Sequence, residues 1–455
     1  MHLVLAHGCF DVLHSGHIAH LREARSLGDR LIVSVMPDHL VNKGPDRPVF
    51  PAAKRMEVLS SLDCVDEVVL CDGPDAVGVI NRLRPAVFVK GIDYAGVESP
   101  GLAREAAAVK LVGGRLHITT TPKWSSTRVI MGERLSPEAL AYLDRVKSCG
   151  YLDKIRSAFD AADKLKIAFV GETIIDEYRY VLPLAKPSKE FILATVEAKE
   201  PEVFFGGVVA ASRHADWPNI KLVTPADTLT KTRYVDEDFS RKLFEVYSKR
   251  GLTLTREERA LFQRQLIAAV HDSDVVIVFD FGHGLMGHAE RRVVERNDHL
   301  AVNAQTNAGN QGFNPITKYA RAHYICIDLP EARLAVQMPD ETDVAVLAKE
   351  IRQDVFCERI VITQGRHGCG ITDSIDGPDG ALSRAIPSFA TRAVDTIGAG
   401  DAFLAVTAPL VAAGLELEIA AFVGNVAGAI KTDIVGHRRH VGRAELMGGI
   451  EALLS

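Results

Sequence analysis

The sequence predicts an α/β protein made of two doubly wound domains, each with a parallel sheet between layers of helices. Short apolar runs of strand length alternate with helical stretches from the first residues onward, which is the rhythm of β-α-β units. This rhythm stops near residue 130 and starts again at Lys166 with the strand KIAFVGE. We therefore expect a first domain over residues 1–135, a helical linker over 136–164 and a second domain over 165–455.

Each expected element follows from a local pattern. In the first domain, strands are expected at LVLAHG, DRLIVSVM, EVVLC and PAVFVKG, with helices over Ile18–Leu27 and PAAKRMEVLSSL between them. Ser136 and Pro137 start a linker helix, which is broken at Gly150. In the second domain, VVIVFDFG, HYICIDL and RIVITQG are rich in β-branched residues, as buried parallel strands are.

Composition and charge exclude several classes of function. The chain of 455 residues is 47% hydrophobic and 25% charged, an ordinary globular balance. Its net charge is −6 with no long basic run, which disfavours a nucleic-acid partner. No apolar stretch has a membrane span's length, and the N-terminus lacks the basic leader of a signal peptide. The seven cysteines form no CxxC pair, so we expect reduced thiols in a cytoplasmic protein that binds small molecules.

The segment HGCFDVLHSGHIAHL, from His7 to Leu21, carries the chemistry of the first domain. His14 and His17 are three residues apart, which places both imidazoles on one face of a helix. Gly16 lets a ligand approach the backbone, and a helix N-terminus adds N–H donors. These features indicate a polyphosphate site in which imidazoles stabilise the charge of departing pyrophosphate. Two unrelated surface histidines are the alternative that an HxGH motif alone permits.

This segment resembles the GxFDxxHxGHxxxL signature of the cytidylyltransferase-like nucleotidyltransferases. Further segments resemble the same family in order: ARSLGDRLIVSVMPD, NKGPDRPVF, KRMEVLSSLDCVDEVV, VKGIDY and PKWSSTRVI. VKGIDY is similar to the VKGGDY of heptose-1-phosphate adenylyltransferases, with Ile92 in place of a glycine. PKWSSTRVI is similar to their terminal segment and departs from it at Arg128.

The resemblance implies how the first domain acts. His14 and His17 would contact the triphosphate, and Lys43 would help to neutralise the transition state. The acceptor would be a sugar 1-phosphate, which is already an anion and needs no general base; Mg²⁺ would bind the phosphates of ATP or CTP. The other nucleotide-binding residues implied are Gly8, Phe10, Asp11, Arg55, Lys90, Ser125, Ser126 and Thr127, and the substrate-binding residues are Asp93 and Tyr94.

DTIGAGDAFLA, which begins at Asp395, carries the chemistry of the second domain. Gly398, Ala399 and Gly400 at the start of a helix present backbone N–H groups to an anion. Asp401 lies in the first turn, where a carboxylate can accept a proton from an attacking hydroxyl. A glycine-rich helix cap without function is the alternative. The stretch resembles the DTxGAGDxF signature of the PfkB/ribokinase carbohydrate kinases.

Supporting segments are GETIIDEY, FFGG, TKTRYV, IDLPEARL, VITQGRHG and DFGHGL, the last of which resembles the DYGKGxL of heptose-7-phosphate kinases. The resemblance implies that Asp401 is the base and that the GAG loop forms an anion hole for the phosphoryl group. It implies a homodimer formed through a lid. It also implies sugar contacts from Asp176, Gly206 and Gly207, Mg²⁺ support from Asp328 and Glu331, and an ATP pocket lined by Gly365, Gly368 and Asn425.

The sugar side of this domain departs from the family pattern. Ala210 stands near the place of a usual Asn, and the stretch from Gly207 to Thr230 is shorter than usual. The segment Asn303–Tyr324 is rich in Asn and Gln where a heptose kinase has a Lys-containing stretch. This segment is either a new binding loop or a solvated connector. We expect an intact phosphoryl-transfer end and a rebuilt sugar end.

Three functions follow from these resemblances. The first is a bifunctional enzyme that transfers a nucleotidyl group to a sugar 1-phosphate, a heptose, and phosphorylates a sugar or sugar phosphate with ATP. Fusions of these two families, in the opposite order, are the bifunctional heptose enzymes. The second is an active transferase fused to a kinase-like domain that only binds ligand. The third is a cytidylyltransferase for a non-sugar phosphate such as glycerol 3-phosphate. The unbroken base and anion hole favour the first.

Overall fold

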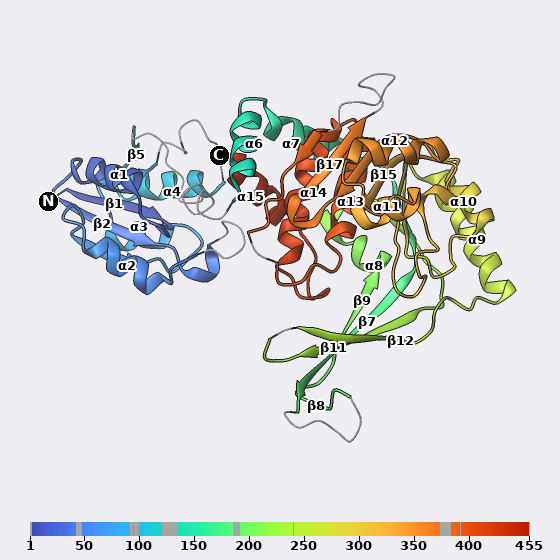
Figure 1. Ribbon diagram of the computed structural model, residues 1–455. Coiled ribbons are helices and arrows are strands. Elements are labelled where there is room, and N and C mark those ends of the chain that lie inside the picture. Colours follow the sequence, from blue (N-terminus) through green and yellow to red (C-terminus); the bar gives the residue numbers. More distant parts are fainter. Residues whose placement is uncertain are drawn as a thin grey trace. The chain divides into compact units, whose positions relative to one another are not determined.

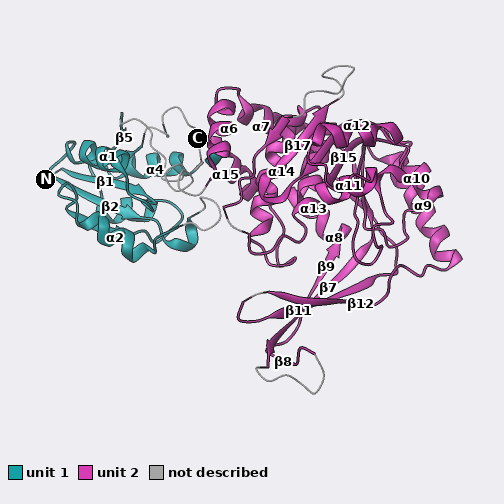
Figure 2. Ribbon diagram, viewed as in Figure 1, with its two compact units in different colours: residues 1–134, 451–453, 455 teal, residues 135–450, 454 magenta. Residues whose placement is uncertain are grey.

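The computed structural model describes residues 2–41, 48–91, 94, 100–120, 135–184, 192–239, 241–373, 384–391 and 393–454. The chain forms two compact units (Figure 2). Unit 1 holds residues 1–134 with 451–453 and 455, and unit 2 holds residues 135–450 with 454. None of the seven cysteines, all of which lie in the described ranges, forms a disulfide bond.

Unit 1 is built on a five-stranded parallel sheet in the order β3-β2-β1-β4-β5. Its strands are β1 (Leu3–Gly8), β2 (Arg30–Val35), β3 (Glu67–Leu70), β4 (Val87–Lys90) and β5 (Arg115–Ile118). The direction in which the chain winds reverses between β1 and β4. In open α/β sheets, ligands bind at such a switch point, in the crevice beyond the carboxyl ends of the strands.

Helices cover both faces of this sheet (Figure 1). They are α1 (Ser15–Arg25), α2 (Ala52–Ser60), α3 (Val77–Leu83) and α4 (Pro100–Leu111), with a 3₁₀ turn η1 (Asp38–Leu40). Val4 packs with Leu21 in one core cluster, whereas the next residue, Leu5, packs with Ile80 and Val109 in another. The alternation of side chains along β1 therefore feeds two cores.

The segment expected as a linker folds as two helices that pack within unit 2. Helix α6 (Pro137–Lys147) starts where the hydroxyl of Ser136 accepts a hydrogen bond from the N–H of Ala139 at 3.2 Å. Helix α7 (Tyr151–Ala162) follows Gly150, whose φ is 68°. The rings of Tyr142 and Tyr151 lie 6.2 and 6.1 Å from that of Phe422, so both helices belong to the core of unit 2.

The main sheet of unit 2 has eight strands in the order β10-β6-β13-β14-β15-β16-β17-β18. The first six are parallel: β10 (Ile220–Val223), β6 (Ile167–Gly171), β13 (Val275–Asp280), β14 (Leu300–Ala304), β15 (Arg321–Asp328) and β16 (Phe356–Thr363). The last two, β17 (Cys369–Asp373) and β18 (Arg384–Ile386), run antiparallel at one edge. The predicted α/β fold with parallel sheets is confirmed, and this antiparallel edge is an addition to it.

Helices flank this sheet on both sides (Figure 1). They are α8 (Val208–Ala211), α9 (Arg256–Asp272), α10 (His288–Val294), α11 (Leu329–Val336), α12 (Val344–Asp354), α13 (Ala399–Ala412), α14 (Leu417–Thr432) and α15 (Arg443–Leu454), with the 3₁₀ turns η3 (His214–Asp216), η4 (Ile316–Lys318) and η5 (Gly365–His367). Helix α13 is buried along most of its length because it is apolar all round. Within the described ranges, no helix combines the length and the apolar character needed to cross a bilayer.

Unit 2 holds a second, small sheet. Its strands are β7 (Thr173–Pro183), β8 (Thr195–Glu197), β9 (Glu202–Gly207), β11 (Leu229–Asp236) and β12 (Lys242–Tyr247). Asp176 of β7 is in register with Lys231 of β11 and Phe204 of β9. The residues next to these three along each strand direct their side chains to the other face of the sheet, which we call the outer face. On this outer face, Val203 and Phe205 are 60% and 58% exposed.

Candidate active sites

The first candidate site lies where β1 ends and α1 begins, beside the switch point of the sheet. His14 is the N-cap of α1, and its Nδ1 accepts a hydrogen bond from the N–H of His17 at 3.4 Å. The two imidazoles stack with centroids 3.9 Å apart, and the ring of Phe10 lies 5.5 Å from that of His17. The structure therefore brings the expected histidine pair together at a helix N-terminus, where partial positive charge favours an anion.

Asp11 and Arg55 fix the loops around this helix start. The carboxylate of Asp11 accepts hydrogen bonds from the N–H groups of Val49 at 2.9 Å and Phe50 at 3.0 Å. Arg55, which is 2% exposed, donates to three main-chain oxygen atoms and to the carboxylate of Asp38 at 2.6 Å. These contacts use Nε and both terminal nitrogen atoms of the guanidinium. Arg55 therefore orders the loops and has no donor nitrogen without a protein partner to offer a nucleotide.

Lys90 lies at the carboxyl end of β4, across the switch point from β1. Its Nζ pairs with Oε2 of Glu105 at 2.8 Å, and both side chains are buried. The ring of Tyr94 lies 4.9 Å from the same Nζ, within cation–π range. Burial and the charge of Lys90 lower the pKa of His7 to about 3, so His7 is neutral at physiological pH. The switch point thus holds one buried ion pair and a neutral imidazole.

The end of β1 is shaped for a close turn. A Cβ on Gly8 would lie 3.0 Å from the ring of Phe10, and Phe10 has a φ of 50°. Five residues that the sequence assigned to this site lie outside the described residues: Lys43, Asp93, Ser125, Ser126 and Thr127. Their roles stay predictions.

The second candidate site lies at the start of α13. Gly398 is the N-cap with a φ of 75°, a conformation that favours glycine, and Ala399 begins the helix. A Cβ on Gly400 would meet no atom within 4 Å, so space is open above this helix start. Burial raises the pKa of Asp401 to about 6. The expected base and anion hole therefore occupy one helix N-terminus, and the base has a pKa suited to work near neutral pH.

Two buried charges hold the loop that leads into α13. Lys431 is completely buried, and its Nζ donates to the carbonyl oxygens of Ile397 and Gly436, both at 2.8 Å. Asp395 accepts from the Nζ of Lys242 at 2.6 Å and from the N–H of Ile397 at 3.1 Å. Burial lowers the pKa of Lys431 to about 8. The loop is thus clamped from α14 on one side and from β12 on the other.

Asp176, the expected sugar ligand, is held by two other side chains. It is 3% exposed and pairs with Arg233 of β11 and with Nε2 of His437 at 3.1 Å. Burial opposes ionisation, but the hydrogen bond from His437 and the charge of Arg233 hold the pKa of Asp176 below its usual value. A Cβ on Gly206 would lie 2.0 Å from Asp176 Oδ2, and Gly207 has a φ of 61°. The structure brings these three expected residues together around a carboxylate that is already paired.

Three side chains at this end were not assigned from the sequence: Lys231, Arg233 and His437. Lys231 and Arg233 alternate in TKTRYV, so period-two spacing placed them on one strand face and offered a signal. His437 had no such signal, because it lies on the segment after α14, far along the chain from Asp176. A Cβ on Gly398 would lie 3.2 Å from Cε1 of His437, so this histidine stands between the two ends of the site.

His283 is a further buried polar residue, and the charge of Lys231 acts on it. It is 1% exposed, and its Nδ1 lies 3.3 Å from the carbonyl oxygen of Arg250. Its Nε2 has no hydrogen-bond partner among the described residues. The ring of Tyr247 lies 6.3 Å from that of His283, and the Nζ of Lys231 lies 5.0 Å from the Tyr247 ring. Burial, with the charge of Lys231, lowers the pKa of His283 to about 4 and keeps it neutral.

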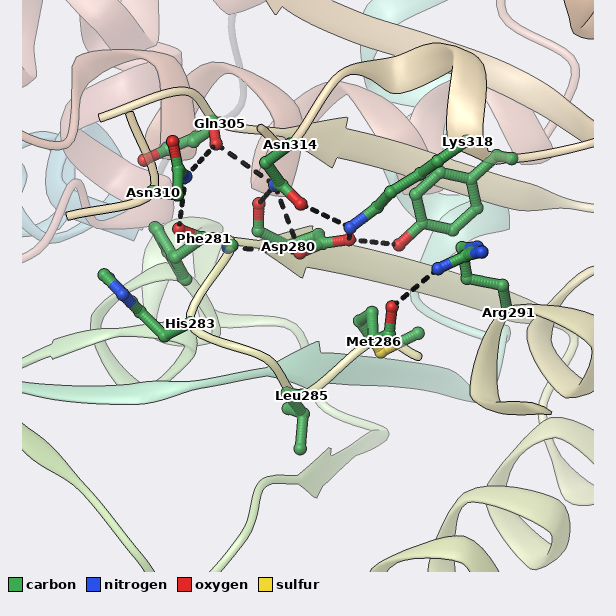
Figure 3. A network of polar contacts seen from close by, with 12 residues as sticks. Asp280, Phe281, His283, Leu285, Met286, Arg291, Gln305, Asn310, Asn314 and Lys318 are labelled. Carbon is green, nitrogen blue, oxygen red and sulfur yellow. Dashed lines mark hydrogen bonds and ion pairs between the residues drawn. The ribbon is translucent and has the colours of Figure 1, made fainter. Parts of the chain in front are cut away.

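The Asn- and Gln-rich segment is a loop in which several side-chain amides bond to main-chain carbonyl oxygens, and its role as a binding loop stays a prediction. Asn307 and Asn310 donate to the carbonyl oxygen of Phe281 at 2.7 and 3.2 Å. Asn314, which is 3% exposed, donates to the carbonyl oxygen of Asp280 at 2.9 Å. Figure 3 shows Asn310 and Asn314 beside Asp280 and Phe281 at the end of β13. The three asparagine side chains therefore bond to main-chain groups of the protein, whereas Phe313 of the same loop is 85% exposed.

Asp328 and Glu331 form a capping box at the start of α11. The N–H of Glu331 donates to Asp328 Oδ1 at 2.7 Å, and the N–H of Asp328 donates to Glu331 Oε2 at 2.9 Å. Glu331 Oε1 accepts from the N–H of Thr306 at 3.2 Å. Burial and the charge of Asp328 raise the pKa of Glu331 to about 8. Both oxygen atoms of Glu331 accept hydrogen bonds from main-chain N–H groups, so this carboxyl group caps α11, and its expected support of Mg²⁺ stays a prediction.

The expected ATP-pocket residues meet at one segment. Asn425 of α14 donates to the carbonyl oxygens of Ile386 and Pro387, both at 3.1 Å. Gly368 has a φ of 85°, and a Cβ there would lie 2.0 Å from the oxygen of Ile386. Gly365, with a φ of 57°, belongs to the same turn between β16 and β17. Across the described residues, no three His, Cys, Asp or Glu side chains gather as a metal site.

Comparison with known proteins agrees with this arrangement. Residues 5–132 match the family "Cytidylyltransferase-like", and residues 298–439 match the "pfkB family carbohydrate kinase" family. "Bifunctional protein HldE" of Methylobacillus flagellatus is 40% identical over 131 residues, which are 28% of this chain and 26% of that protein. HldE of Streptomyces coelicolor is 47% identical over 115 residues, 25% of this chain and 24% of that protein.

These matches lie in the N-terminal part, and the chain spans about a quarter of the length of the curated relatives that it matches. A solved structure of phosphofructokinase-2 from Escherichia coli, in complex with potassium, covers 64% of this chain and 99% of its own. Its TM-score is 0.50 and its identity 14%, which is a likeness of fold. The chain therefore joins a cytidylyltransferase-like domain at its N-terminus to a pfkB-family carbohydrate kinase domain.

Proposed function

We propose that unit 1 transfers a nucleotidyl group from ATP or CTP to a sugar 1-phosphate, a heptose 1-phosphate, and releases pyrophosphate. The observation that carries this proposal is the stacked pair of His14 and His17 at the N-terminus of α1, beside the switch point. The attacking acceptor is already an anion, so the site needs charge stabilisation and positioning more than a base. The similarity to HldE proteins supports a heptose acceptor.

Unit 2, in this proposal, phosphorylates a sugar or sugar phosphate with ATP. Asp401 accepts the proton of the attacking hydroxyl, while the N–H groups at the start of α13 stabilise the transferring phosphoryl group. Mg²⁺ bound to ATP would neutralise phosphate charge, as it does on free nucleotides. Asp328 and Glu331 act by fixing the start of α11. The buried cations Lys231 and Arg233 favour an acceptor that carries a phosphate.

One observation favours a second candidate function for unit 2. Asp176 is already paired with Arg233 and His437, so a sugar hydroxyl would have to compete for its oxygen atoms. A unit that binds ATP and a ligand without transferring a phosphoryl group would tolerate such a carboxylate. In that case unit 2 would be a regulatory module fused to an active transferase.

The outer face of the small sheet supports a homodimer as part of the proposal. Val203, Phe205, Phe244 and Val246 lie on this face and are each about half exposed or more, at 60%, 58%, 48% and 49%. An exposed apolar sheet face of this kind marks a protein–protein contact more often than a free surface. Replacing Phe205 and Phe244 with Ser should convert a dimer to a monomer in analytical ultracentrifugation.

Pyrophosphate release by the purified chain tests the transferase half. ATP and CTP are each supplied with heptose 1-phosphates, other sugar 1-phosphates and glycerol 3-phosphate. We expect release with a heptose 1-phosphate; release with CTP and glycerol 3-phosphate alone would establish the non-sugar alternative. A parallel assay follows ATP consumption with a heptose 7-phosphate. ATP binding without consumption, across neutral sugars and sugar phosphates, would establish the binding-only unit.

A further inference from the structure

The amide of Gln305 contacts the carboxylate of Asp401 directly. Its Nε2 donates a hydrogen bond to Asp401 Oδ1 at 2.8 Å. Gln305 follows β14 and Asp401 lies in the first turn of α13, so the tertiary fold alone brings these two residues together. Among the described residues, Gln305 supplies the one side-chain hydrogen bond to this carboxylate.

The main chain of Gln305 is fixed on both sides. Its N–H donates to the carbonyl oxygen of Asp280 at 2.8 Å. Its own carbonyl oxygen accepts from Asn310 Nδ2 at 2.9 Å and from Asn314 Nδ2 at 3.1 Å. Figure 3 shows the two asparagine amides converging on Gln305 and on the end of β13. The Asn-rich loop is therefore a stable platform that presents one amide to Asp401.

A primary amide is well suited to hold a general base. It donates a hydrogen bond to a carboxylate but does not give up its proton, so it cannot neutralise the base by proton transfer. The bond favours the ionised form and so opposes the effect of burial. With Oδ1 held by Gln305, Oδ2 is the oxygen left for the proton of the acceptor hydroxyl.

We propose that Gln305 is a positioning residue for Asp401 and fixes which carboxylate oxygen faces the acceptor. This inference rests on the proposed kinase function of unit 2. The contact removes rotation about the Cβ–Cγ bond of Asp401, so the base is pre-oriented before the acceptor binds. Misplacement of a reacting group by about 1 Å can reduce turnover on the order of 10²-fold, so the loss of this restraint on Asp401 should be measurable in kcat.

Other charged groups face Asp401 from three neighbouring parts of the unit. Lys231 comes from β11, Lys431 from α14, and His437 from the segment after α14; all three favour the ionised carboxylate. Asp176 of β7 acts in the opposite sense. The variants below leave these four groups in place, so a change in the titration of Asp401 reports the loss of the amide.

The test compares Gln305→Ala and Gln305→Glu with Gln311→Ala, an exposed glutamine of the same loop. The titration of Asp401 is followed by carbon-13 NMR of protein labelled at aspartate carboxyl carbons, and Asp401→Asn identifies the signal. We expect Gln305→Ala and Gln305→Glu to move the titration to higher pH and Gln311→Ala to leave it unchanged. Equal titration curves in wild type and Gln305→Ala would overturn the proposal.

Kinetics supply the second readout, with ATP and a heptose 7-phosphate as the probe. Gln305→Ala should lower kcat about 10-fold to 100-fold, with little change in the KM for ATP. Its acidic limb of kcat against pH should shift in the same direction as the NMR titration. An unchanged or higher kcat would mean that Gln305 blocks the acceptor position and would overturn the inference. No turnover by the wild type would refute the kinase function itself, while the NMR titration would still decide the contact.

Discussion

The two candidate sites of this chain use the same structural device with different side chains. Each lies at a helix N-terminus, α1 in unit 1 and α13 in unit 2. At α1 the helix start carries the stacked imidazoles of His14 and His17. The nearby carboxylate of Asp11 accepts hydrogen bonds from two backbone N–H groups. At α13 the first turn carries Asp401, whose pKa is raised to about 6 by burial.

This difference follows the nucleophile that each unit is proposed to use. A phosphate attacks as an anion and needs no base, so a site for it can be built from cationic and hydrogen-bonding groups alone. A sugar hydroxyl must lose a proton as it attacks, so its site needs a carboxylate whose pKa lies close to neutral pH. Both sites lie at a helix N-terminus, but the proposed site in unit 1 needs groups that stabilise charge, whereas the proposed site in unit 2 also needs a base.

Replacing Asp401 with Asn tests the comparison most severely. The variant keeps the shape of the side chain and removes the base, so phosphoryl transfer should fall by about 10²–10⁴-fold. ATP consumption with a heptose 7-phosphate is the measurement. Pyrophosphate release by unit 1 serves as the internal control for folding and should stay unchanged. Unchanged ATP consumption would remove Asp401 from its assigned role.

His17→Ala makes the matching change in unit 1. Removing one imidazole from the helix start should lower nucleotidyl transfer by about 10²–10³-fold, because a group that stabilises developing charge is lost. Phosphoryl transfer should be unaffected. His39→Ala, at an exposed position of η1, is the matched control. Retained transfer in His17→Ala would place the site elsewhere in unit 1.

Arg233→Met tests how far the acceptor end depends on its buried ion pair. Asp176 would stay buried with His437 as its remaining partner, and breaking a buried pair costs about 3–5 kcal/mol of stability. Unfolding in urea should show this loss in unit 2. The double variant Arg233→Met with Asp176→Leu should recover part of it, because no charge is then left buried. A single variant as stable as wild type would show that the pair is not needed.

The pH dependence of the proposed kinase reaction tests whether Asp401 acts as the base. Asp401 must be ionised to act as a base, and its raised pKa of about 6 keeps the proton bound to a higher pH than for an ordinary aspartate. Phosphoryl transfer should therefore fall about tenfold per pH unit below pH 6. Above pH 8, Lys431 loses its charge and with it part of its hold on the loop before α13. A flat profile between pH 5 and 7 would contradict the assignment.

Asn425→Ala is expected to have the smallest effect. It removes two hydrogen bonds to the carbonyl oxygens of Ile386 and Pro387, each worth about 1 kcal/mol. The segment beside Gly368 should loosen, and the KM for ATP should rise severalfold with little change in kcat. Steady-state kinetics at varied ATP concentration measures this. A loss of kcat without a change in the KM for ATP would contradict the assignment of Asn425 to the ATP pocket.

Some features of the molecule could be predicted from the sequence because they depend on neighbours along the chain. The β-α-β order follows from the alternation of apolar runs. Both helix starts follow from short motifs, HSGH at His14 and GAGD at Asp401, because a cap and its first turn are made by consecutive residues. The period-two spacing of Lys231 and Arg233 in TKTRYV likewise predicts that both cationic side chains lie on one face of β11.

Other features were decided only by the tertiary structure, because their partners come from distant segments. The sequence placed Arg55 at the nucleotide, whereas the fold surrounds it with carbonyl oxygens from three loops. It assigned Asp176 to a sugar, whereas β11 and the segment after α14 supply Arg233 and His437 as partners. The amide of Gln305 reaches Asp401 because β14 and α13 end and begin side by side. Spacing along a chain fixes local geometry, and long-range contacts depend on how the elements pack.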